Sequence, residues 1–152
     1  MVPVGSWDQG MRESTAEDLP AIRSLLTEAS LPTADLESSP GLCLWVAEDG
    51  GALVGVIGLE PCRGAGLLRS LVVAPCHRKR GLGRRLVDTV EGHAKAAGLK
   101  QLALLTETAD RFIEAFGYRL GDRHNVPDEI RQSAEFRTLC PLSARCMAKV
   151  IA

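Results

Sequence analysis

Two apolar runs on either side of one amphipathic segment constrain the fold of this chain more than any other feature. The runs are GLLRSLVVAP at 66–75 and KQLALLTE at 100–107, and each is apolar enough to predict a strand covered on both faces. The segment between them predicts a helix from about 81 to 97, about 25 Å long at about 1.5 Å per residue. A connection of that length joins parallel strands and is expected to be right-handed. The centre of the fold is therefore predicted to be a parallel strand pair.

The predicted helix carries its apolar and charged residues on opposite sides. Gly98 follows its last turn and predicts a C-cap, because glycine adopts the left-handed conformation that ends many helices. The apolar positions recur every four residues, as expected for a helix that packs on a sheet. This stripe consists of Leu82, Leu86, Val90 and Ala94.

A hairpin is predicted ahead of the parallel pair. The segments 42–49 and 52–60 have strand patterns, and Gly50-Gly51 between them suits a two-residue turn. Pro61 is expected to end the second strand, since proline cannot donate to a strand ladder. The hairpin adds antiparallel strands, so the sheet is predicted to be mixed.

A first helix is predicted from about 16 to 29. Thr15 and Asp18 have the spacing of a capping box, and apolar residues at helical spacing follow them. The fold class is therefore α/β (α+β): a mixed, mostly antiparallel sheet with a central parallel pair and helices on both faces. The length of the chain suits a single domain over 1–152.

The C-terminal part is less regular. TADRFIEAFGY at 108–118 predicts a short helix that stops at Gly117, and a strand is expected to begin near Tyr118. The segment 122–144 is rich in loop residues, and 145–151 predicts a last strand.

Composition excludes several classes of function. The net charge is −1 and aromatic residues make up 4%, whereas a protein that coats nucleic acid is basic and offers aromatic rings for stacking. No apolar run approaches the ~20 residues that span a membrane. The start MVPVGSWDQG lacks the basic and apolar regions of a signal peptide, so a cytoplasmic location is expected.

The cysteines do not predict a disulfide framework or a metal site. There are five, an odd number, and no C-x-x-C pair occurs among them. None of the three histidines pairs with a cysteine at ligand spacing. We therefore expect no metal.

The segment HRKRGLGRR at 77–85 places five basic residues around two glycines. It lies between the end of a buried strand and the start of the long helix, where backbone N–H groups and a partial positive charge are exposed. Gly81 and Gly83 would let an anion approach the backbone closely. The segment is neither a Walker A loop nor a complete dinucleotide fingerprint. Two explanations remain, a solvated basic turn and a phosphate site.

The stretch LVVAPCHRKRGLGRRLV resembles motif A of the GNAT superfamily of acetyl-CoA-dependent N-acetyltransferases. The likeness consists of a strand ending V-x-P, then Arg78-x-x-Gly81-x-Gly83 and an amphipathic helix, and it extends to AFGY before a later strand. It implies that acetyl-CoA is the cosubstrate and that the glycine turn binds its pyrophosphate, with further charge for the 3′-phosphate. The end of the preceding strand would pair with pantetheine, and one N–H there, assigned to Val73, would polarise the thioester carbonyl. The implied coenzyme A contacts are Leu71, Val72, Val73, Arg78, Lys79, Arg80, Gly81, Leu82, Gly83, Arg84, Thr108 and Phe112.

Two narrower likenesses concern the acceptor. LLTETADRFIEAFGY is similar to the corresponding stretch of N-acetylglutamate synthase acetyltransferase domains. The segments LLRSLVVAP, LLTETAD and SAEFRTLCP resemble the arsenic-resistance-associated branch of the superfamily. Both imply a small α-amino acid or an amino-acid-like toxin as the acceptor.

Arg69 is the only charge in GLLRSLVV, and two roles are open to it. It can form an internal salt bridge, with Glu60 on the neighbouring strand as the candidate partner, since a buried unpaired charge is costly. It can instead bind a substrate carboxylate, phosphinate or arsonate through its forked guanidinium. Arg137 is a second candidate for that role, unless it is a solvated surface residue, and Ser70 and Cys140 complete the predicted acceptor site.

The chain departs from the family at both usual acid–base positions. Leu67 stands where many members have a glutamate base, and Ile113 stands where many have a tyrosine acid. Thr106 and Ser70 are the predicted catalytic substitutes, since Thr106 ends a parallel strand, where ligands gather in such sheets. Thr108, Glu107 and Cys140 are further candidates, with helix capping as the alternative role of Thr108.

Two functions from different classes follow. The first is direct transfer of acetyl from acetyl-CoA to the amine of a small anionic acceptor, and a homodimer is compatible with it. The second is a non-catalytic module that binds coenzyme A or an acyl-CoA as a sensor or regulator, an option that the missing acid–base residues keep open. No nucleic-acid or membrane partner is expected.

Overall fold

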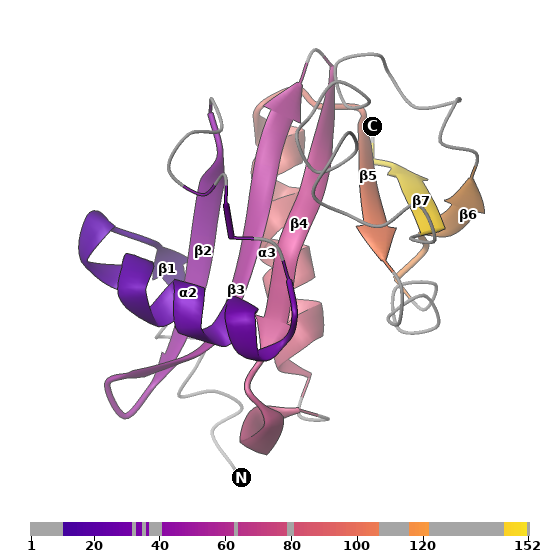
Figure 1. Ribbon diagram of the computed structural model, residues 1–152. Helices are drawn as coiled ribbons and strands as arrows, with labels where there is room; N and C mark the ends of the chain where they lie inside the picture. The colour runs from indigo at the N-terminus through magenta and orange to yellow at the C-terminus, as the bar shows by residue number, and fades with distance from the viewer. Residues whose placement is uncertain are drawn as a thin grey trace, which may run out of the picture.

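The predicted parallel pair lies in the middle of the sheet in the computed structural model (Figure 1). The structure describes residues 11–31, 33–34, 36, 41–62, 64–78, 81–106, 116–121 and 145–151. These residues form a seven-stranded sheet of order β1-β2-β3-β4-β5-β7-β6, in which β4 and β5 are parallel and every other neighbouring pair is antiparallel. The described elements are β1 (Arg12–Glu13), the 3₁₀ helix η1 (Ala16–Asp18), α2 (Leu19–Glu28), β2 (Cys43–Asp49), β3 (Ala52–Cys62), β4 (Ala65–Val73), the 3₁₀ helix η2 (Pro75–His77), α3 (Leu82–Ala96), β5 (Gln101–Thr106), β6 (Arg119–Gly121) and β7 (Arg145–Val150).

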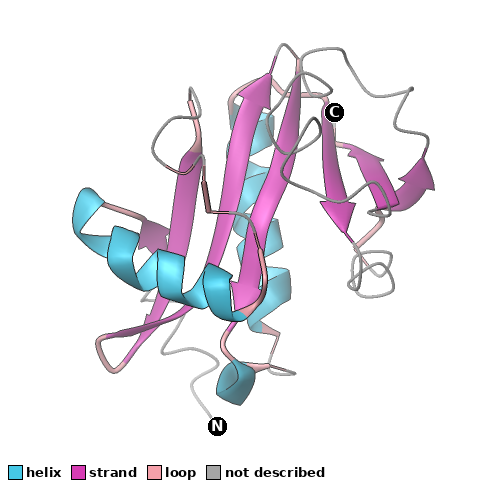
Figure 2. Cartoon of the chain, in the orientation of Figure 1, coloured by secondary structure: helices cyan, strands magenta, loops and turns pink. Residues whose placement is uncertain are grey.

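One helix covers each face of the sheet, so the predicted fold class is confirmed (Figure 2). The stripe of α3 packs on the face that carries Trp45, Ile57 and Leu68, which we call the α3 face. On the opposite face, the α2 face, helix α2 packs with its buried Ile22 and Leu26 against strands β2 to β4. The predicted boundaries of both helices hold to within a few residues, although the first turn of the N-terminal helix is 3₁₀.

The predicted end of β3 at Pro61 is wrong. The strand continues to Cys62, and Pro61 lies opposite Gly66 of β4. Its missing N–H is tolerated because β2 begins at Cys43, opposite Leu59, so the β2 edge of β3 has no ladder partner beyond that point among the described residues. The hairpin itself is as predicted, since Gly50 and Gly51 both have positive φ, 63° and 85°.

The parallel pair is short. Its register covers Ala65↔Gln101, Gly66↔Leu102 and Leu67↔Ala103, and within the described strands the pairing stops there. β4 continues to Val73 and β5 to Thr106, and the two strands diverge toward these C-terminal ends (Figure 1). Among the described residues, the β5-facing edge of β4 therefore has no ladder partner over its second half, and we call this part of β4 the open edge.

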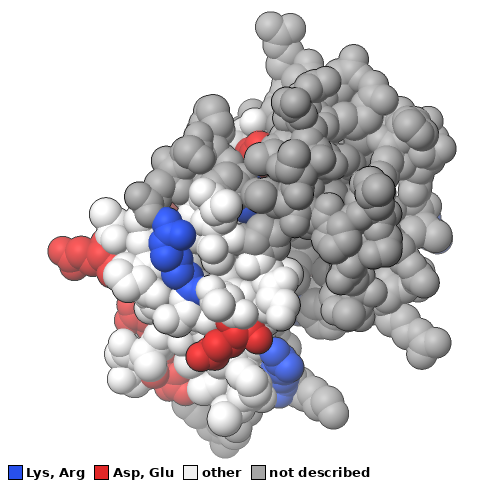
Figure 3. Space-filling model, in the orientation of Figure 1, with Lys and Arg blue, Asp and Glu red and all other residues white. Residues whose placement is uncertain are grey.

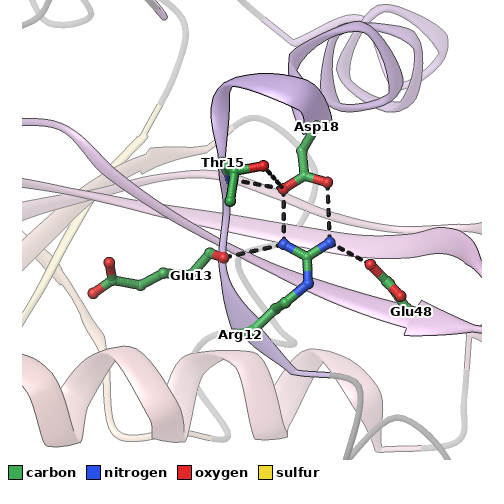
Figure 4. A network of polar contacts seen from close by, with 5 residues as sticks. All are labelled: Arg12, Glu13, Thr15, Asp18 and Glu48. Carbon is green, nitrogen blue, oxygen red and sulfur yellow. Dashed lines mark hydrogen bonds and ion pairs between the residues drawn. The ribbon is translucent and has the colours of Figure 1, made fainter.

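A polar network joins β1 to η1 and β2 (Figure 4). Nη1 and Nη2 of Arg12 donate to the two carboxylate oxygens of Asp18 at 2.8 and 3.0 Å, and Nη2 also pairs with Glu48. The backbone N–H of Thr15 donates to Asp18 Oδ2 at 2.7 Å, as the capping-box spacing predicts. The network fixes the start of α2 against the sheet.

The same network predicts a loss of stability in acid. Hydrogen bonding from Arg12, and then from the Thr15 backbone, lowers the pKa of Asp18 from 3.8 to about 2. The network therefore stabilises the fold above about pH 4, and this contribution is lost as the pH falls toward 2. Because Arg12 is 41% exposed and screened by water, we expect about 1 kcal/mol. Urea unfolding between pH 2 and 6 should show Asp18→Asn less stable at pH 6 and equal to the parent at pH 2. The same difference in unfolding free energy between the two proteins at every pH would contradict this.

A second polar cluster fixes the C-terminal strands to α3. Tyr118 is fully buried, and its hydroxyl donates to Glu91 Oε2 at 2.8 Å. Burial raises the pKa of this hydroxyl, and the contact with Glu91 raises it further. Lys149 of β7 donates to Glu91 at 3.1 Å and to the Phe116 carbonyl at 2.8 Å. The cluster ties β7, and the residues just before β6, to α3.

Candidate functional site

The glycine turn lies at the N-terminus of α3, as predicted. Gly81 is the N-cap residue and has a left-handed backbone, with φ 81° and ψ 6°. Gly83 is buried in the first helical turn. The first turn of any helix leaves N–H groups without intrahelical partners, and these carry partial positive charge. The start of α3 therefore offers an anion both hydrogen-bond donors and partial positive charge. A residue with a side chain at position 81 would be strained in this left-handed conformation.

The arginines of the turn have different surroundings. Arg78 is exposed, and its Nε donates to the carbonyl of Val73 at 3.0 Å, which links the turn to the end of β4. Arg84 has a 63% exposed side chain whose Nε lies 3.9 Å from Asp88, and its guanidinium lies 5.5 Å from the ring centroid of Phe116. Both can reach solvent beside the helix N-terminus. Lys79 and Arg80 lie outside the described residues.

A bulge interrupts β4 near its middle. The β3 ladder pairs Gly58 with Arg69 and Val56 with Val72, so Ile57 lies opposite two residues, Ser70 and Leu71. Ser70 has a φ of 59°, a left-handed conformation that costs about 1–3 kcal/mol for a residue other than glycine. Strained residues of this kind cluster at functional sites.

The bulge and the strand divergence affect the same part of β4. Leu71, Val72 and Val73 follow the bulge, and they lie beyond the last described pair with β5. A strand edge without a partner presents N–H and C=O groups that an extended ligand can pair with. The predicted pantetheine contacts thus lie on a strand edge that has no partner in the described part of the chain and that leads to the glycine turn.

Arg69 forms the internal ion pair that the sequence left as one of two alternatives. Its Nη1 lies 3.3 Å from Glu60 Oε1, and its Nε donates to Ser70 Oγ at 3.3 Å. The side chain of Arg69 is 0% exposed, and that of Glu60 is 11% exposed. Gly58, opposite Arg69, leaves room for its stem, since a Cβ there would lie 3.4 Å from Arg69 Cγ.

Other predicted site residues are only partly placed. Thr106 is the last residue of β5 and pairs with Arg145 of β7, so it does lie at a strand end. Leu67, at the usual position of the base, is fully buried. The predicted Glu107, Thr108, Phe112, Ile113, Arg137 and Cys140 lie outside the described residues.

His77 is a site neighbour that the sequence reasoning missed. Its Nε2 lies 2.8 Å from Asp49 Oδ2, which connects the residue before Arg78 to the end of β2. The two residues are 28 positions apart, so no local pattern pointed to this contact. The contact supports the start of the glycine turn.

The surface of the described part shows no concentration of one charge on the face seen in Figure 3, where acidic and basic side chains are interspersed. None of the described helices has the length and apolar character to cross a membrane. Among the described residues, no three His, Cys, Asp or Glu side chains gather in a way that suits a metal ion. Cys43 and Cys76 are free and exposed.

The comparisons with known proteins identify the family. The family profile described as acetyltransferase (GNAT) domain matches residues 40–120, just over half of the chain. The chain belongs to the GNAT acetyltransferase family. The matched segment includes the diverging strands, the bulge and the glycine turn, so the geometry described above is that of a GNAT-type acetyltransferase domain.

Individual relatives agree with this assignment. N-acetyltransferase family 8 member 3 of Rattus norvegicus is 37% identical over 84 residues, which cover 51% of this chain and 36% of that protein. Amino-acid acetyltransferase of Ralstonia nicotianae is 33% identical over 89 residues, 57% of this chain and 20% of that one. The chain thus spans about a third or less of these curated relatives.

A solved structure shares the GNAT fold over most of this chain. N-acetylglutamate synthase from Neisseria gonorrhoeae, complexed with coenzyme A and N-acetyl-glutamate, superposes with a TM-score of 0.78 at 19% identity. The superposition covers 93% of this chain and 35% of that protein. At this level of identity the likeness supports the fold.

Proposed function

We propose that the chain is an N-acetyltransferase that moves acetyl from acetyl-CoA directly to the amine of a small amino acid or amino-acid-like molecule. The observation that carries this proposal is the open edge of β4, which leads from the bulge at Ser70 to the helix N-terminus at Gly81. A long ligand with an extended arm and a pyrophosphate matches both features. The helix N-terminus alone would suit any anion, and the strand edge alone would suit any extended ligand.

The described residues fit coenzyme A. The N–H groups at the start of α3 and the exposed Arg78 and Arg84 would bind phosphate oxygens. Leu71 to Val73 would pair with the pantetheine arm, and the N–H of Val73 would polarise the thioester carbonyl. Acetyl-CoA supplies the acetyl group, and these residues hold it and orient it.

An amino acid is the proposed acceptor class. Two proteins similar to this chain are named for that chemistry, an amino-acid acetyltransferase and an N-acetylglutamate synthase. Arg69 is a cation immediately before the β4 bulge, beside Ser70, and an acceptor carboxylate would bind there. The likeness to the arsenic-resistance-associated branch adds a phosphinate or arsenic analogue of an amino acid to this class.

A coenzyme A sensor is the second candidate. The buried, apolar Leu67 at the usual position of the base favours it, because a sensor needs no residue that accepts a proton. This candidate shares the coenzyme A contacts and differs only in having no acceptor. Turnover therefore separates the two.

The test is acetyl transfer followed by mass spectrometry. The protein would be incubated with acetyl-CoA and glutamate, aspartate, methionine, phosphinothricin, its arsenic analogue and several polyamines. We expect an acetylated amino acid or amino-acid analogue. Acetylation of polyamines alone would overturn the proposed acceptor class, and no product despite tight coenzyme A binding would favour the sensor.

A further inference from the structure

We propose that Glu60 and Arg69 together bind the zwitterionic head group of an α-amino acid, and that Glu60 takes the proton from its α-ammonium group. This inference rests on the proposed function and narrows its acceptor class. The acceptor would need an α-carboxylate and a free α-amine on the same carbon. Simple amines and polyamines would be poor acceptors.

The sheet register places the two side chains together. Glu60 lies opposite Leu67, and Arg69 lies opposite Gly58, so Glu60 and Arg69 are diagonal neighbours across β3 and β4. Both project from the α2 face, because Gly58 and Glu60 alternate with Ile57 and Leu59 of the α3 face. Their charged atoms meet at 3.3 Å. A carboxylate and a guanidinium thus lie side by side in a buried position.

The pair lies at the reaction site that the fold defines. Arg69 immediately precedes the bulge and donates to Ser70 Oγ at 3.3 Å. The open edge proposed for pantetheine begins with the next residue, Leu71. Among the described residues on this part of the α2 face, Glu60 is the carboxylate nearest in register to Leu67, the position that lacks one. An acceptor bound to the pair would present its amine toward the thioester.

The charge balance of the pair favours a zwitterion. Because Glu60 neutralises Arg69, the pair offers little net attraction to a simple anion. An α-amino acid brings both charges, so its carboxylate can bind the guanidinium while its ammonium binds the carboxylate of Glu60. Each charge of the pair then keeps an opposite partner after the acceptor has bound.

The proposed step is balanced in protons and electrons. The carboxylate of Glu60 accepts one proton from the α-ammonium, directly or through a water, which leaves a neutral amine. The nitrogen lone pair attacks the thioester carbon, a C–N bond forms and the C–S bond breaks. The second proton of the nitrogen goes to the departing sulfur, which gives the free thiol, and Glu60 releases its proton to solvent.

Matched acceptors test the recognition of the zwitterion. The pairs would be glutamate with 4-aminobutyrate and leucine with isoamylamine, each amine lacking only the α-carboxyl group. We expect the unmodified protein to prefer the α-amino acid by about 10²-fold or more in kcat/KM, since a site built for a polar group rejects an analogue without it. Equal kcat/KM values for the two members of each pair would overturn the inference. The proposed acetyl transfer would then stand with a wider acceptor class.

The pH profile of Glu60→Gln tests the proton transfer. The variant should lose about 10²- to 10⁴-fold in kcat/KM at neutral pH. The deficit should shrink about tenfold per pH unit as more of the acceptor is already neutral in solution. Glu60→Asp should restore part of the rate. Coenzyme A affinity, measured by calorimetry, should stay unchanged.

Glu91→Gln is the matched control, because Glu91 is also ion-paired and largely enclosed but lies on α3. We expect this variant to keep the parent's dependence of kcat/KM on pH. A deficit in Glu60→Gln that is uniform from pH 6 to 10, without rescue by aspartate, would overturn the base role and leave the ion pair as structural.

Folding and the sensor alternative need separate readouts. Should Glu60→Gln not fold, the double variant Glu60→Leu/Arg69→Met removes both charges and should still bind coenzyme A. We expect calorimetry to show glutamate or leucine binding to the coenzyme A complex of the parent and not to that of the double variant. Binding that survives in the double variant would overturn the inference. Amino-acid binding without turnover would instead reject the proposed function while keeping the recognition site.

Discussion

Gly81→Asp is expected to weaken coenzyme A binding by about 10²- to 10³-fold. A second negative charge about 4 Å from a phosphate costs about 4 kcal/mol at an effective dielectric constant of about 20, and about 1.4 kcal/mol is tenfold in affinity. Among the described residues, and apart from its chain neighbours and the helix backbone, nothing lies within 4 Å of a Cβ at this position. Aspartate also tolerates a left-handed backbone better than most residues do. The variant should therefore fold, and the loss should appear in calorimetric titration with coenzyme A.

Gly81→Asn is the control for this prediction. Asparagine has nearly the same shape and the same tolerance of φ 81°, but it carries no charge. We expect a much smaller loss with asparagine. The difference between the two variants should also shrink at high salt, because added ions screen exposed charges. Equal affinities for the aspartate and asparagine variants would show that phosphate does not bind at this helix N-terminus.

Arg69→Met is expected to lower the free energy of unfolding by about 3–5 kcal/mol. Removing one partner of a buried ion pair leaves the other charge without compensation, and the Arg69 and Glu60 side chains are 0% and 11% exposed. The double variant Glu60→Leu/Arg69→Met should recover most of this stability, because apolar residues of similar volume replace a buried pair at little cost. Denaturant unfolding of Arg69→Met, Glu60→Leu and the double variant measures the coupling energy between the two side chains.

The stability of the double variant separates structure from function. If the pair serves only the fold, the double variant should remain an active acetyltransferase. If the pair serves the acceptor, the double variant should be stable, should bind coenzyme A and should not acetylate α-amino acids. If the double variant instead loses as much unfolding free energy as the two single variants together, the side chains of Glu60 and Arg69 do not stabilise one another.

The central fold could be predicted from the sequence because its signals are local. The stripe from Leu82 to Ala94 depends only on helical spacing, and the two apolar runs around it require a crossover between parallel strands. Gly50-Gly51 and Gly98 mark a turn and a helix end through the backbone freedom of glycine, and all three have positive φ. The position of the glycine turn at the start of α3 follows from the same order of elements.

The end of β3 could not be predicted in this way. Pro61 has the same residue-level effect wherever it occurs, yet whether its missing N–H matters depends on the strand beside it. Here β2 begins at Cys43, opposite Leu59, so within the described part of the chain Pro61 has no ladder partner on the β2 side. The contact between His77 and Asp49 is similar, because it joins positions that only the sheet order brings together.

The sequence by itself determined the parallel strand–helix–strand unit, the basic glycine turn at its centre and the family that they mark. Only the tertiary structure decided the bulge at Ser70, the opening between β4 and β5 and the partner of Arg69. The physical reason is the register between strands: Ile57 faces two residues of β4, and this shift sets which side chains reach each face. Residue spacing along one strand carries no information about that register, so the Glu60–Arg69 pair remained one of two alternatives until β3 and β4 were seen together.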